Sequence, residues 1–525
     1  MRINRIIFFL GLLINSVVVF GQNEITWTES FRTDRKQRLT KMIGADSSYF
    51  FVLQEITGKT STWELHVYNK ETMATKSISA IELPSLPGVE MRMDDVLLFG
   101  ERLLLITTAK DEGAELLSAY GTWLSTEGKP ADFPVLLGEQ STGRKRVNNQ
   151  FGFELSGDMS KLLIFNESEF ERKANERFTL KVMDADLETV WQKDLELPYS
   201  REIFEINQYA VDYRGHVYMM SGITNDKLKK KEGDRPVSDK RYVIISYDPD
   251  QNKVKEFEVS LENKWVISTT FALADDGDLV IGGFYSNNRY FSIAGSFFFR
   301  IDGDTKAIEA KGLHPFSKEV LAQFMSERKA EKGLELEDFY FDHFMLREDG
   351  GASMVAEQYY VTQRFQTDIA SGRQEIQYFY HFNDVLIVDI NAEGEINWVT
   401  KVAKIQVSMN DKGPYSSYAL SHVSDTLCLV FNDNRDNVAL LAKNPEAKVN
   451  SFSTVRRSSV TLAKVFPDGT QARTALLSSK DQETLIKPKV NISEADGAVF
   501  IYSQLRKNVR FGRIHFGLGD FKGIR

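Results

Sequence analysis

The sequence predicts an all-β protein built from one antiparallel unit that recurs along the whole chain. The first observation is a hairpin pattern that occurs seven times: an apolar run, a turn of Asp, Asn, Gly or Pro, and a second, more polar extended run. The second observation is that four such strands recur in a fixed order. The third is that the strands left over at the two ends of the chain complement each other. Recurrence on this scale indicates a radial or stacked repeat.

The repeating unit contains four strands. The seven hairpins lie at 63–83, 121–137, 178–195, 242–259, 297–313, 385–402 and 460–477. Residues 204–259 give the clearest template, because an alternating run (FEINQYAVDYRG) and a nearly continuous apolar run (HVYMMSGIT) precede the hairpin 242–259. Four antiparallel strands per repeat are the unit of a β-propeller.

The ends of the sequence predict that the ring closes. Residues 486–493, 498–505 and 509–516 provide three strands without a fourth, and residues 24–31 provide one orphan strand. A last blade made from all four would hide both sheet edges and bring the count to eight blades. Seven blades are the alternative if the second repeat, 95–137, is irregular. A pair of β-sandwich domains is the alternative architecture, since sandwiches also contain short alternating strands.

The first 21 residues have the pattern of a secretory signal peptide. Arg2 and Arg5 precede the apolar stretch 6–20, and a cleavage site lies before Gln22. We therefore expect residues 22–525 to form a single propeller domain that is periplasmic or extracellular, including the cell surface. A single membrane anchor is the alternative, but the run is short for a spanning helix, so we expect no stable membrane insertion. The one cysteine, Cys428, lies in an apolar run and is expected to be buried.

Charge and motifs exclude several classes of function. The 525 residues carry a net charge of −9, which argues against nucleic acid as a partner. The segment 431–437 resembles the start of a calcium loop, but Asn437 stands where Gly is needed and Lys443 where Glu is needed. The histidines show no paired metal-ligand spacing, and neither a G-x-S-x-G elbow nor a P-loop is present. We therefore predict no metal and no cofactor and can name no catalytic residue.

Four long insertions are expected on one face of the ring. They are the segments 225–241, 314–338, 361–381 and 432–458, and they fall in connections that emerge on the same side of a propeller. Long loops gathered on one face often mark the binding face. One short helix is expected within 316–333, where Ser317 can cap it and Gly333 can end it. The carboxyl and imidazole groups of Asp342, His343, Glu357 and Asp384 are expected near this face, without a link between them.

The largest extension, 357–382, supplies the candidate binding residues. It is expected to form a protruding hairpin that turns near Ala370–Gly372. Tyrosine and arginine are enriched at interface hot spots, because they bury a large area and keep a polar group. The candidates are Tyr359, Tyr360, Arg364, Phe365, Tyr378, Phe379, Tyr380 and His381. The alternative is that these rings pack on neighbouring loops of the same chain.

The repeat layout over roughly 24–517 resembles the β-propeller superfamily, and the leader ending FGQ resembles exported proteins of Bacteroidetes-type bacteria. Subfamily signatures such as repeated W-D dipeptides, kelch double glycines or an adjacent Cys pair do not occur, so no catalytic residues carry over. We expect an exported scaffold that binds a protein or glycan partner in the cell envelope through its long-loop face. The alternative is a hydrolase or lyase that cleaves polysaccharide or peptide with carboxylates at the channel mouth.

Overall fold

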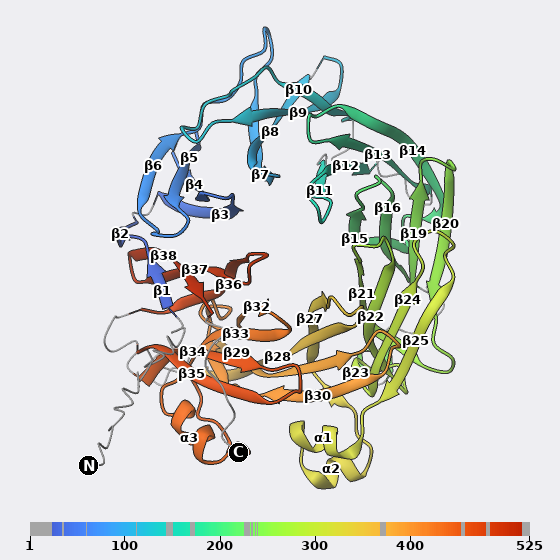
Figure 1. Cartoon of the computed structure of the whole chain (residues 1–525), viewed down its shortest axis with the longest axis vertical. Helices are drawn as coiled ribbons and strands as arrows, with labels where there is room; N and C mark the ends of the chain where they lie inside the picture. Colours follow the sequence, from blue (N-terminus) through green and yellow to red (C-terminus); the bar gives the residue numbers. More distant parts are fainter. Residues whose placement is uncertain are drawn as a thin grey trace, which may run out of the picture.

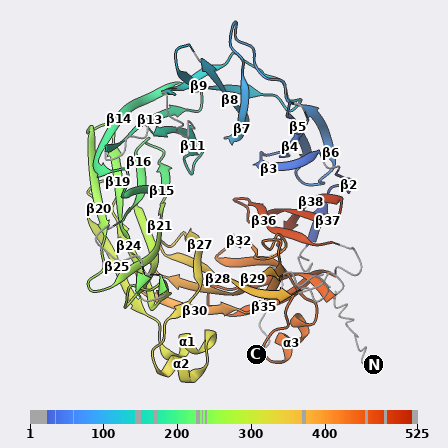
Figure 2. The ribbon, with the colours of Figure 1, turned by 180° about the vertical axis from the view of Figure 1, so that it is seen from behind.

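Eight four-stranded antiparallel sheets stand around a central opening, as the two opposite views show (Figures 1 and 2). The computed structural model describes residues 24–516 apart from 34–35, 59, 112, 143–150, 168–173, 225–230, 233–234, 237, 239, 368–373, 453–456 and 479–483. The prediction of a β-propeller is therefore confirmed, and so is the count of eight blades. The second repeat forms a regular blade, so the seven-bladed alternative is wrong, as is the pair of sandwiches.

The first four blades follow the chain from the inner strand outward. Blade one contains β3 (Gln37–Ala45), β4 (Tyr49–Ile56), β5 (Thr62–Asn69) and β6 (Thr75–Ala80). Blade two contains β7 (Arg92–Phe99), β8 (Arg102–Asp111), β9 (Leu116–Leu124) and β10 (Val135–Ser141). Blade three contains β11 (Gly152–Leu155), β12 (Lys161–Glu167), β13 (Asn175–Asp184) and β14 (Thr189–Ser200). Blade four contains β15 (Phe204–Val211), β16 (Val217–Thr224), β19 (Lys240–Asp248) and β20 (Lys253–Val259).

The next three blades keep this order. Blade five contains β21 (Trp265–Leu273), β22 (Leu279–Ser286), β24 (Gly295–Ile301) and β25 (Ile308–Pro315). Blade six contains β27 (Phe339–Leu346), β28 (Ala352–Thr367), β29 (Gln374–Ile390) and β30 (Ile396–Val402). Blade seven contains β32 (Ala419–Val423), β33 (Thr426–Asn434), β34 (Ser458–Val465) and β35 (Gln471–Ser478).

Both ends of the chain share blade eight. It contains β36 (Ile486–Ser493), β37 (Val499–Leu505), β38 (Asn508–His515) and, as its outer strand, β1 (Glu24–Trp27). The register pairs Glu24 with His515 and Trp27 with Gly512, and the short strand β2 (Phe31–Arg32) continues along β38. The last blade is therefore completed by the first strand of the chain, as the leftover strands predicted.

Burial explains why the strands differ in sequence. The second strand of a blade is covered on both faces by neighbouring blades, and β22 is buried along its whole length. The outer strand is covered on one side only, and β20 alternates between exposed and covered positions. Apolar clusters join adjacent blades, as where Phe284 and Phe298 of blade five meet Met354 and Leu386 of blade six. The near-continuous apolar runs in the sequence therefore correspond to second strands, which are covered on both faces, and the alternating runs correspond to strands covered on one face.

The long connections carry the irregular elements. In each blade, the connections between strands two and three and those to the next blade emerge on one face, called here the long-loop face. Three small ladders lie in these connections. They are β17 (Lys231–Glu232) with β18 (Arg235–Pro236), β23 (Ser292–Ile293) with β26 (Leu336–Glu337), and β31 (Gln406–Met409) beside β29. One hairpin turn on the opposite face is also long, since β9 ends at Leu124 and β10 begins at Val135.

The expectation of a single helix is wrong in number, although the range 316–333 is helical. Three short helices occur among the described residues: α1 (Lys318–Phe324), α2 (Glu327–Glu331) and α3 (Asn437–Lys443). The run 316–333 breaks because Met325 and Ser326 are extended, and Ser326 begins the second helix. All three lie outside the ring, away from its opening (Figures 1 and 2). The third was missed because it is short and follows a strand that ends in polar residues.

The expected leader, residues 1–21, lies outside the described residues, as does the hairpin tip near Ala370–Gly372. In the described part of the chain, no helix is long and apolar enough to cross a membrane. Cys428 is buried in β33, as expected.

Side-chain contacts between blade one and blade eight stabilise the closed ring. Arg513 of β38 is 2% exposed; it donates to Glu494 at 3.0 Å and Asp496 at 3.0 Å in its own blade and to Glu71 of blade one at 2.8 Å. The rings of Phe50 and Phe500 stack across the same interface with centroids 4.0 Å apart.

Arg513→Leu is expected to lower the free energy of unfolding by about 2–4 kcal/mol, because it removes a buried cation from three carboxylates and leaves the buried Glu494 with Lys70 alone, at 2.6 Å. The measurement is urea unfolding followed by fluorescence. The control is Arg177→Leu, which removes an exposed ion pair with Glu196 and should lower the free energy of unfolding far less, because exposed ion pairs are screened by water. Equal losses for the two variants would contradict the closing role of Arg513.

Candidate functional site

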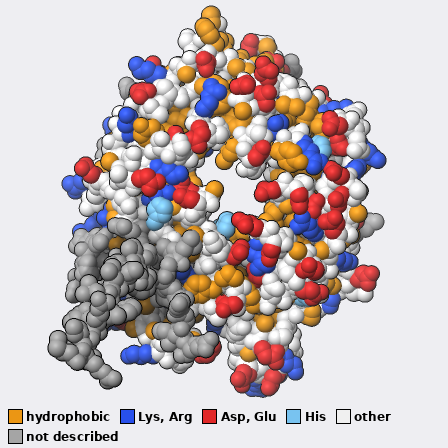
Figure 3. Space-filling model, viewed as in Figure 1, with side chains coloured by type: hydrophobic (Ala, Val, Ile, Leu, Met, Phe, Trp, Pro, Cys, Tyr) orange, Lys and Arg blue, Asp and Glu red, His pale blue; other side chains and the backbone are white. Residues whose placement is uncertain are grey.

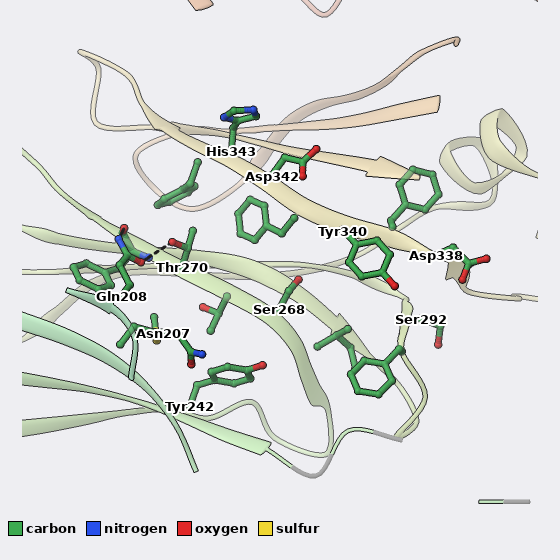
Figure 4. Close-up of a pocket in the computed structure, with 18 of the residues that line it drawn as sticks. Asn207, Gln208, Tyr242, Ser268, Thr270, Ser292, Asp338, Tyr340, Asp342 and His343 are labelled. Atoms are coloured by element: carbon green, nitrogen blue, oxygen red, sulfur yellow. Dashed lines mark hydrogen bonds between the residues drawn. The ribbon is translucent and has the colours of Figure 1, made fainter. Parts of the chain in front are cut away.

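A cavity of about 950 Å³ lies between the inner strands of blades four, five and six (Figure 4). Its walls are the strands β15, β21 and β27. It extends to the long-loop face, because it also contacts Tyr242 at the start of β19, Tyr290–Ser292 before β24, and Glu337–Asp338 before β27. No motif could have revealed this cavity, since each blade contributes only a few residues to it.

The cavity has one polar wall that is held in place by hydrogen bonds between blades. Gln208 of blade four donates its amide to the carbonyl oxygen of Phe271 in blade five at 2.9 Å. The Thr270 hydroxyl donates to the side-chain oxygen of Gln208 at 2.8 Å. Behind this wall, Gly282 lets Phe344 of blade six pack closely, because a Cβ at this position would stand 2.5 Å from the ring. The walls are therefore set by packing rather than by loops.

Acidic side chains occupy the wall formed by β27. Asp338 immediately precedes the strand and adopts a left-handed backbone with φ of 65°. Desolvation, and then the charge of Glu337, raise the pKa of Asp338. Figure 4 shows Asp338 and Tyr340 near Ser292 at one end of the cavity, and Gln208 at the other. When all side chains are drawn, the central opening remains, with acidic groups along part of its rim (Figure 3).

Asp342 is the most strongly perturbed acid in the cavity. The side chain of Asp342 is partly accessible to solvent. Desolvation by the surrounding protein, and then the charge of Glu357, raise the pKa of its carboxyl group to about 6. The Tyr418 hydroxyl of blade seven donates to it at 3.0 Å and opposes this shift. The neighbouring His343 lies with its ring 5.7 Å from that of Tyr418, and desolvation lowers its pKa.

The buried residue Lys404 connects Glu357 and Asp384, two acids for which the sequence analysis predicted no link. The ammonium group of Lys404, which is fully buried, donates to Glu357 at 2.5 Å and to the carbonyl oxygen of Phe382 at 3.2 Å. Its backbone N–H donates to Asp384 at 3.0 Å. The other oxygen of Glu357 accepts from the Ser417 hydroxyl at 2.7 Å. Glu357 is therefore committed to holding the base of the long hairpin and is not available as a free acid or base.

The candidate hairpin forms as expected, from β28 and β29, which extend well past the blade. Cross-strand partners share a face of the sheet, and the register pairs Tyr359 with Phe382, Phe365 with Ile376 and Val361 with Tyr380. One face therefore carries the set that we call the hairpin wall: Tyr359, Val361, Phe365, Ile376, Tyr378 and Tyr380. The strand β31 pairs with β29 from Phe379 to Phe382 and supports the hairpin from the side.

The other four candidates lie on the opposite face and contact each other. The rings of Tyr360 and His381 stack with centroids 4.4 Å apart, and His381 also bonds the Thr362 hydroxyl at 2.9 Å. The guanidinium of Arg364 lies 4.9 Å from the ring centre of Phe379. Desolvation, and then the charge of Arg364, lower the pKa of His381. These contacts support self-packing for this face.

The cavity and the hairpin wall meet at Tyr340. Its side chain lines the cavity, and its ring lies 5.9 Å from that of Tyr359, which in turn lies 4.8 Å from Phe382. Tyr340 and Phe365 are 57% and 70% exposed, respectively. An aromatic surface thus continues from the cavity onto the hairpin.

One group among the described residues has the composition of a cation site: His216, Asp248 and Asp250. It lies at the short turns, opposite the long-loop face. The carboxylate of Asp248 already accepts the backbone N–H groups of Asp250 and Gln251 at 3.0 and 3.1 Å. As expected for Asp at such turns, this carboxylate shapes the turn.

The pKa of Asp342 predicts a specific dependence of stability on pH. Between about pH 4 and pH 6 the folded protein holds the Asp342 proton more tightly than the unfolded chain does. As pH rises through this window, the free energy of unfolding of the native protein should therefore fall relative to that of Asp342→Asn, and the difference should be constant above about pH 7. Denaturant unfolding at several pH values measures it.

Tyr418→Phe provides the matched control. It removes the hydrogen bond that stabilises the carboxylate, so the window should extend to higher pH. A difference between native protein and Asp342→Asn that is constant from pH 4 to pH 7 would contradict the assignment.

No protein-family model matches the chain, and no curated protein matches it. Among solved structures, the β-propeller domain of the Trilobed protease from Pyrococcus furiosus is similar at 9% identity and a TM-score of 0.36, over 84% of this chain and 98% of that one. The WD40 domain of SCAP from fission yeast is similar at 9% identity and 0.38, over 95% and 99%. A member of the DUF4221 family from Bacteroides vulgatus is similar at 13% identity and 0.28, over 78% and 93%.

Because these TM-scores are low, the assignment of the fold rests on the strand pairing of this chain itself. Its eight sheets, each with four antiparallel strands, and the last blade shared by both ends of the chain are the defining features of a closed propeller. The chain therefore has the fold of a closed, eight-bladed β-propeller.

Proposed function

We propose that the chain is an exported binding propeller that holds a protein or glycan partner of the cell envelope on its long-loop face. One observation carries the proposal: the exposed aromatic surface of the hairpin wall is continuous, through Tyr340, with the cavity between blades four and six. Export is inferred from the leader-like residues 1–21.

The exposure of the hairpin wall supports binding. Val361, Phe365, Ile376 and Tyr378 are all exposed on one face of a sheet that leaves the body of the ring. A contiguous apolar surface of this kind on a soluble protein marks an interaction site. Tyrosine and phenylalanine contribute large contact areas with few rotatable bonds, so little conformational entropy is lost when a partner binds.

The rigid base of the hairpin formed by β28 and β29 also supports a binding function. Lys404 ties β28 to β29 through Glu357 and the Phe382 carbonyl, and β31 adds a third strand to the hairpin. A surface that is held in shape before the partner arrives loses less entropy on binding than a free loop. The buried charge pair thus stabilises the position of the wall.

A hydrolase or lyase is the second candidate, and Asp342 favours it. A carboxyl group with a pKa of about 6 can donate a proton near neutral pH, as a general acid must. A glycosidase also needs a second carboxyl group about 5–10 Å away. Asp338 lies four residues earlier, just before the same strand and at the other end of the cavity wall, and Glu357 is held by Lys404 and Ser417. Binding is therefore the better supported function.

The double variant Phe365→Ala, Tyr378→Ala should lose capture of the partner by at least about tenfold, because it removes the two rings that present the largest exposed surface of the wall. The measurement is retention of envelope proteins and of arrayed glycans by the immobilised mature chain, followed by the affinity of whatever is retained. The urea midpoint should change little, since both rings are exposed.

The matched control is Phe133→Ala, which removes a ring that is 87% exposed on the opposite face of blade two. Equal retention by the native chain, the double variant and the control would exclude the hairpin wall as the binding surface. Loss of folding by the double variant would show that the rings are structural.

The hydrolase candidate has its own test. Incubation with polysaccharide and peptide substrates should yield cleavage products with the native chain and none with Asp342→Asn, if Asp342 is the acid. Products that persist in Asp342→Asn would remove this residue from any catalytic role.

A further inference from the structure

The part of β28 that extends beyond the blade has one side without a neighbouring strand. Within the blade, β27 pairs with β28 as far as Phe339, which lies opposite Gln358. Beyond this point β28 continues to Thr367, and the only described strand that pairs with it there is β29. The chain before β27 leaves the ladder, because Asp338 adopts a left-handed backbone and β26 pairs with β23 instead. The ladder between β27 and β28 therefore ends while β28 goes on.

Two hydrogen bonds show which backbone groups face this open side. The N–H of Tyr359 donates to the carbonyl oxygen of Asp338 at 2.8 Å, so the backbone of Tyr359 faces the line of β27. On the other strand, the carbonyl oxygen of Tyr378 accepts from the N–H of Asn410 at 2.9 Å, so Tyr378 faces away from β28. Its cross-strand partner Gln363 must then face away from β29. Because this direction alternates along a strand, every second residue presents both backbone groups to the open side. We call these N–H and C=O groups the open edge; they belong to Val361, Gln363 and Phe365.

The hydrogen-bonding groups of the open edge are unused. Among the described residues, none donates to or accepts from the backbone of these three residues on this side. The side chains from Val361 to Gln366 are all exposed, so this part of β28 is not covered by another part of the molecule. A strand edge of this kind is a template on which another chain can pair.

Other exposed edges of the ring are protected by charge. The outer strand β20 exposes Lys253, Glu256 and Glu258, and charged side chains on an edge discourage pairing with another chain. From Val361 to Gln366, by contrast, the single charged side chain is Arg364, and neither a proline nor a shift in register interrupts the segment. The open edge therefore lacks the features that normally prevent the addition of a strand.

The side chains beside the open edge define the strand that fits it. On one face, Val361 and Phe365 of the hairpin wall are 41% and 70% exposed. On the opposite face, the guanidinium of Arg364 lies over the ring of Phe379 and forms no ion pair with a described residue. Opposite charges and apolar pairs stabilise neighbouring strands. A segment with apolar residues at alternate positions and a carboxylate between them would complement both faces.

An extended polypeptide is the ligand that the open edge favours. Its groups recur with the repeat of a β-strand, about 6.8 Å for every two residues, and each residue of the open edge offers one donor and one acceptor. A partner strand offers the matching acceptors and donors at the same repeat. A sugar chain could stack on the rings of the hairpin wall, but its hydroxyl groups do not follow this repeat.

We propose that a partner protein adds an extended segment to the open edge as an antiparallel strand, in line with β27. The proposal rests on the proposed binding function, and it narrows the partner to a protein with an accessible extended segment. The apolar side chains of that segment lie against the hairpin wall, and an acidic side chain lies beside Arg364.

The test is calorimetric titration of the mature chain, residues 22–525, with the peptide acetyl-Val-Glu-Thr-Thr-Val-amide. In an antiparallel register centred on Gln363, the first, third and fifth residues of the peptide direct their N–H groups to β28, and the second and fourth direct theirs away. Methylation of the third peptide nitrogen should weaken binding by at least about tenfold, because it removes a central hydrogen bond and places a methyl group between the strands. Methylation of the fourth nitrogen, the matched control, should change the affinity by less than about twofold.

Variants of the chain test the same contacts from the other side. Gln363→Pro removes one N–H of the open edge and leaves the hydrogen bonds to β29, so it should weaken the peptide by at least about tenfold. Gln363→Ala keeps that N–H and should weaken the peptide by less than about threefold. Arg364→Gln should weaken it by about two- to fivefold, and this loss should disappear when the peptide carries Gln in place of Glu. An unchanged urea midpoint shows that each variant is folded.

Equal effects of the two methylations, or equal affinities of Gln363→Pro and Gln363→Ala, would overturn the proposal. So would the absence of binding by the native chain at peptide concentrations up to about 1 mM. Because the methylated peptides are tested on the native chain, this comparison does not depend on the folding of a variant.

Capture of the envelope partner separates this inference from the proposed function. A partner that is retained equally by the native chain and by Gln363→Pro, but lost from the double variant Phe365→Ala, Tyr378→Ala, would keep the hairpin wall as the binding surface and overturn strand addition. A captured glycan would have the same meaning. A protein partner that is lost from both Gln363→Pro and the double variant, and retained by Gln363→Ala, is the expected result.

Discussion

The pairing of β1 with β38 is the constraint on which the rest of the molecule depends. Each blade covers its neighbours, so an open ring would leave two blade faces and two edges in water. The outer strand of blade eight, the buried Arg513 with its three carboxylates and the stacked rings of Phe50 and Phe500 remove that exposure. Since this chain has a single cysteine, no disulfide within it can secure the ring, and packing and charge must do so.

Closure also fixes where chemistry can occur. The walls of the cavity come from three blades, and their spacing is set by the ring and by contacts such as the bond between Gln208 and Phe271. The long hairpin is set by a different device, the buried Lys404 between Glu357 and Asp384. Tyr340 stands where the two systems meet. The long-loop face is thus one surface with two rigid supports, which suits a partner that is recognised by shape and charge together.

The sequence predicts the architecture almost completely, because each blade repeats a local pattern and the end strands complement one another. It predicts the hairpin 357–382 and the alternation of its two faces for the same reason: strand periodicity is local. The cavity could not be predicted, since Gln208, Thr270 and Asp338 come from different blades and share no motif. Lys404 was missed because a lysine beside a strand is normally solvated. The single helix expected within 316–333 forms as two short helices, whose apolar residues Leu321 and Ala330 join the core cluster of blades five and six.

The shared last blade has a consequence for the order in which the molecule forms. Glu24 pairs with His515, so the first strand of the domain finds its partner only when almost the entire chain is present. Blades one to seven are local in sequence and can form as the chain emerges, whereas closure is a contact of very high sequence separation and is expected to come last. Until then β1 has no partner, and blades one and seven each offer an uncovered face. The interval before closure is therefore the stage of folding at which this protein is most exposed to misassembly with another copy.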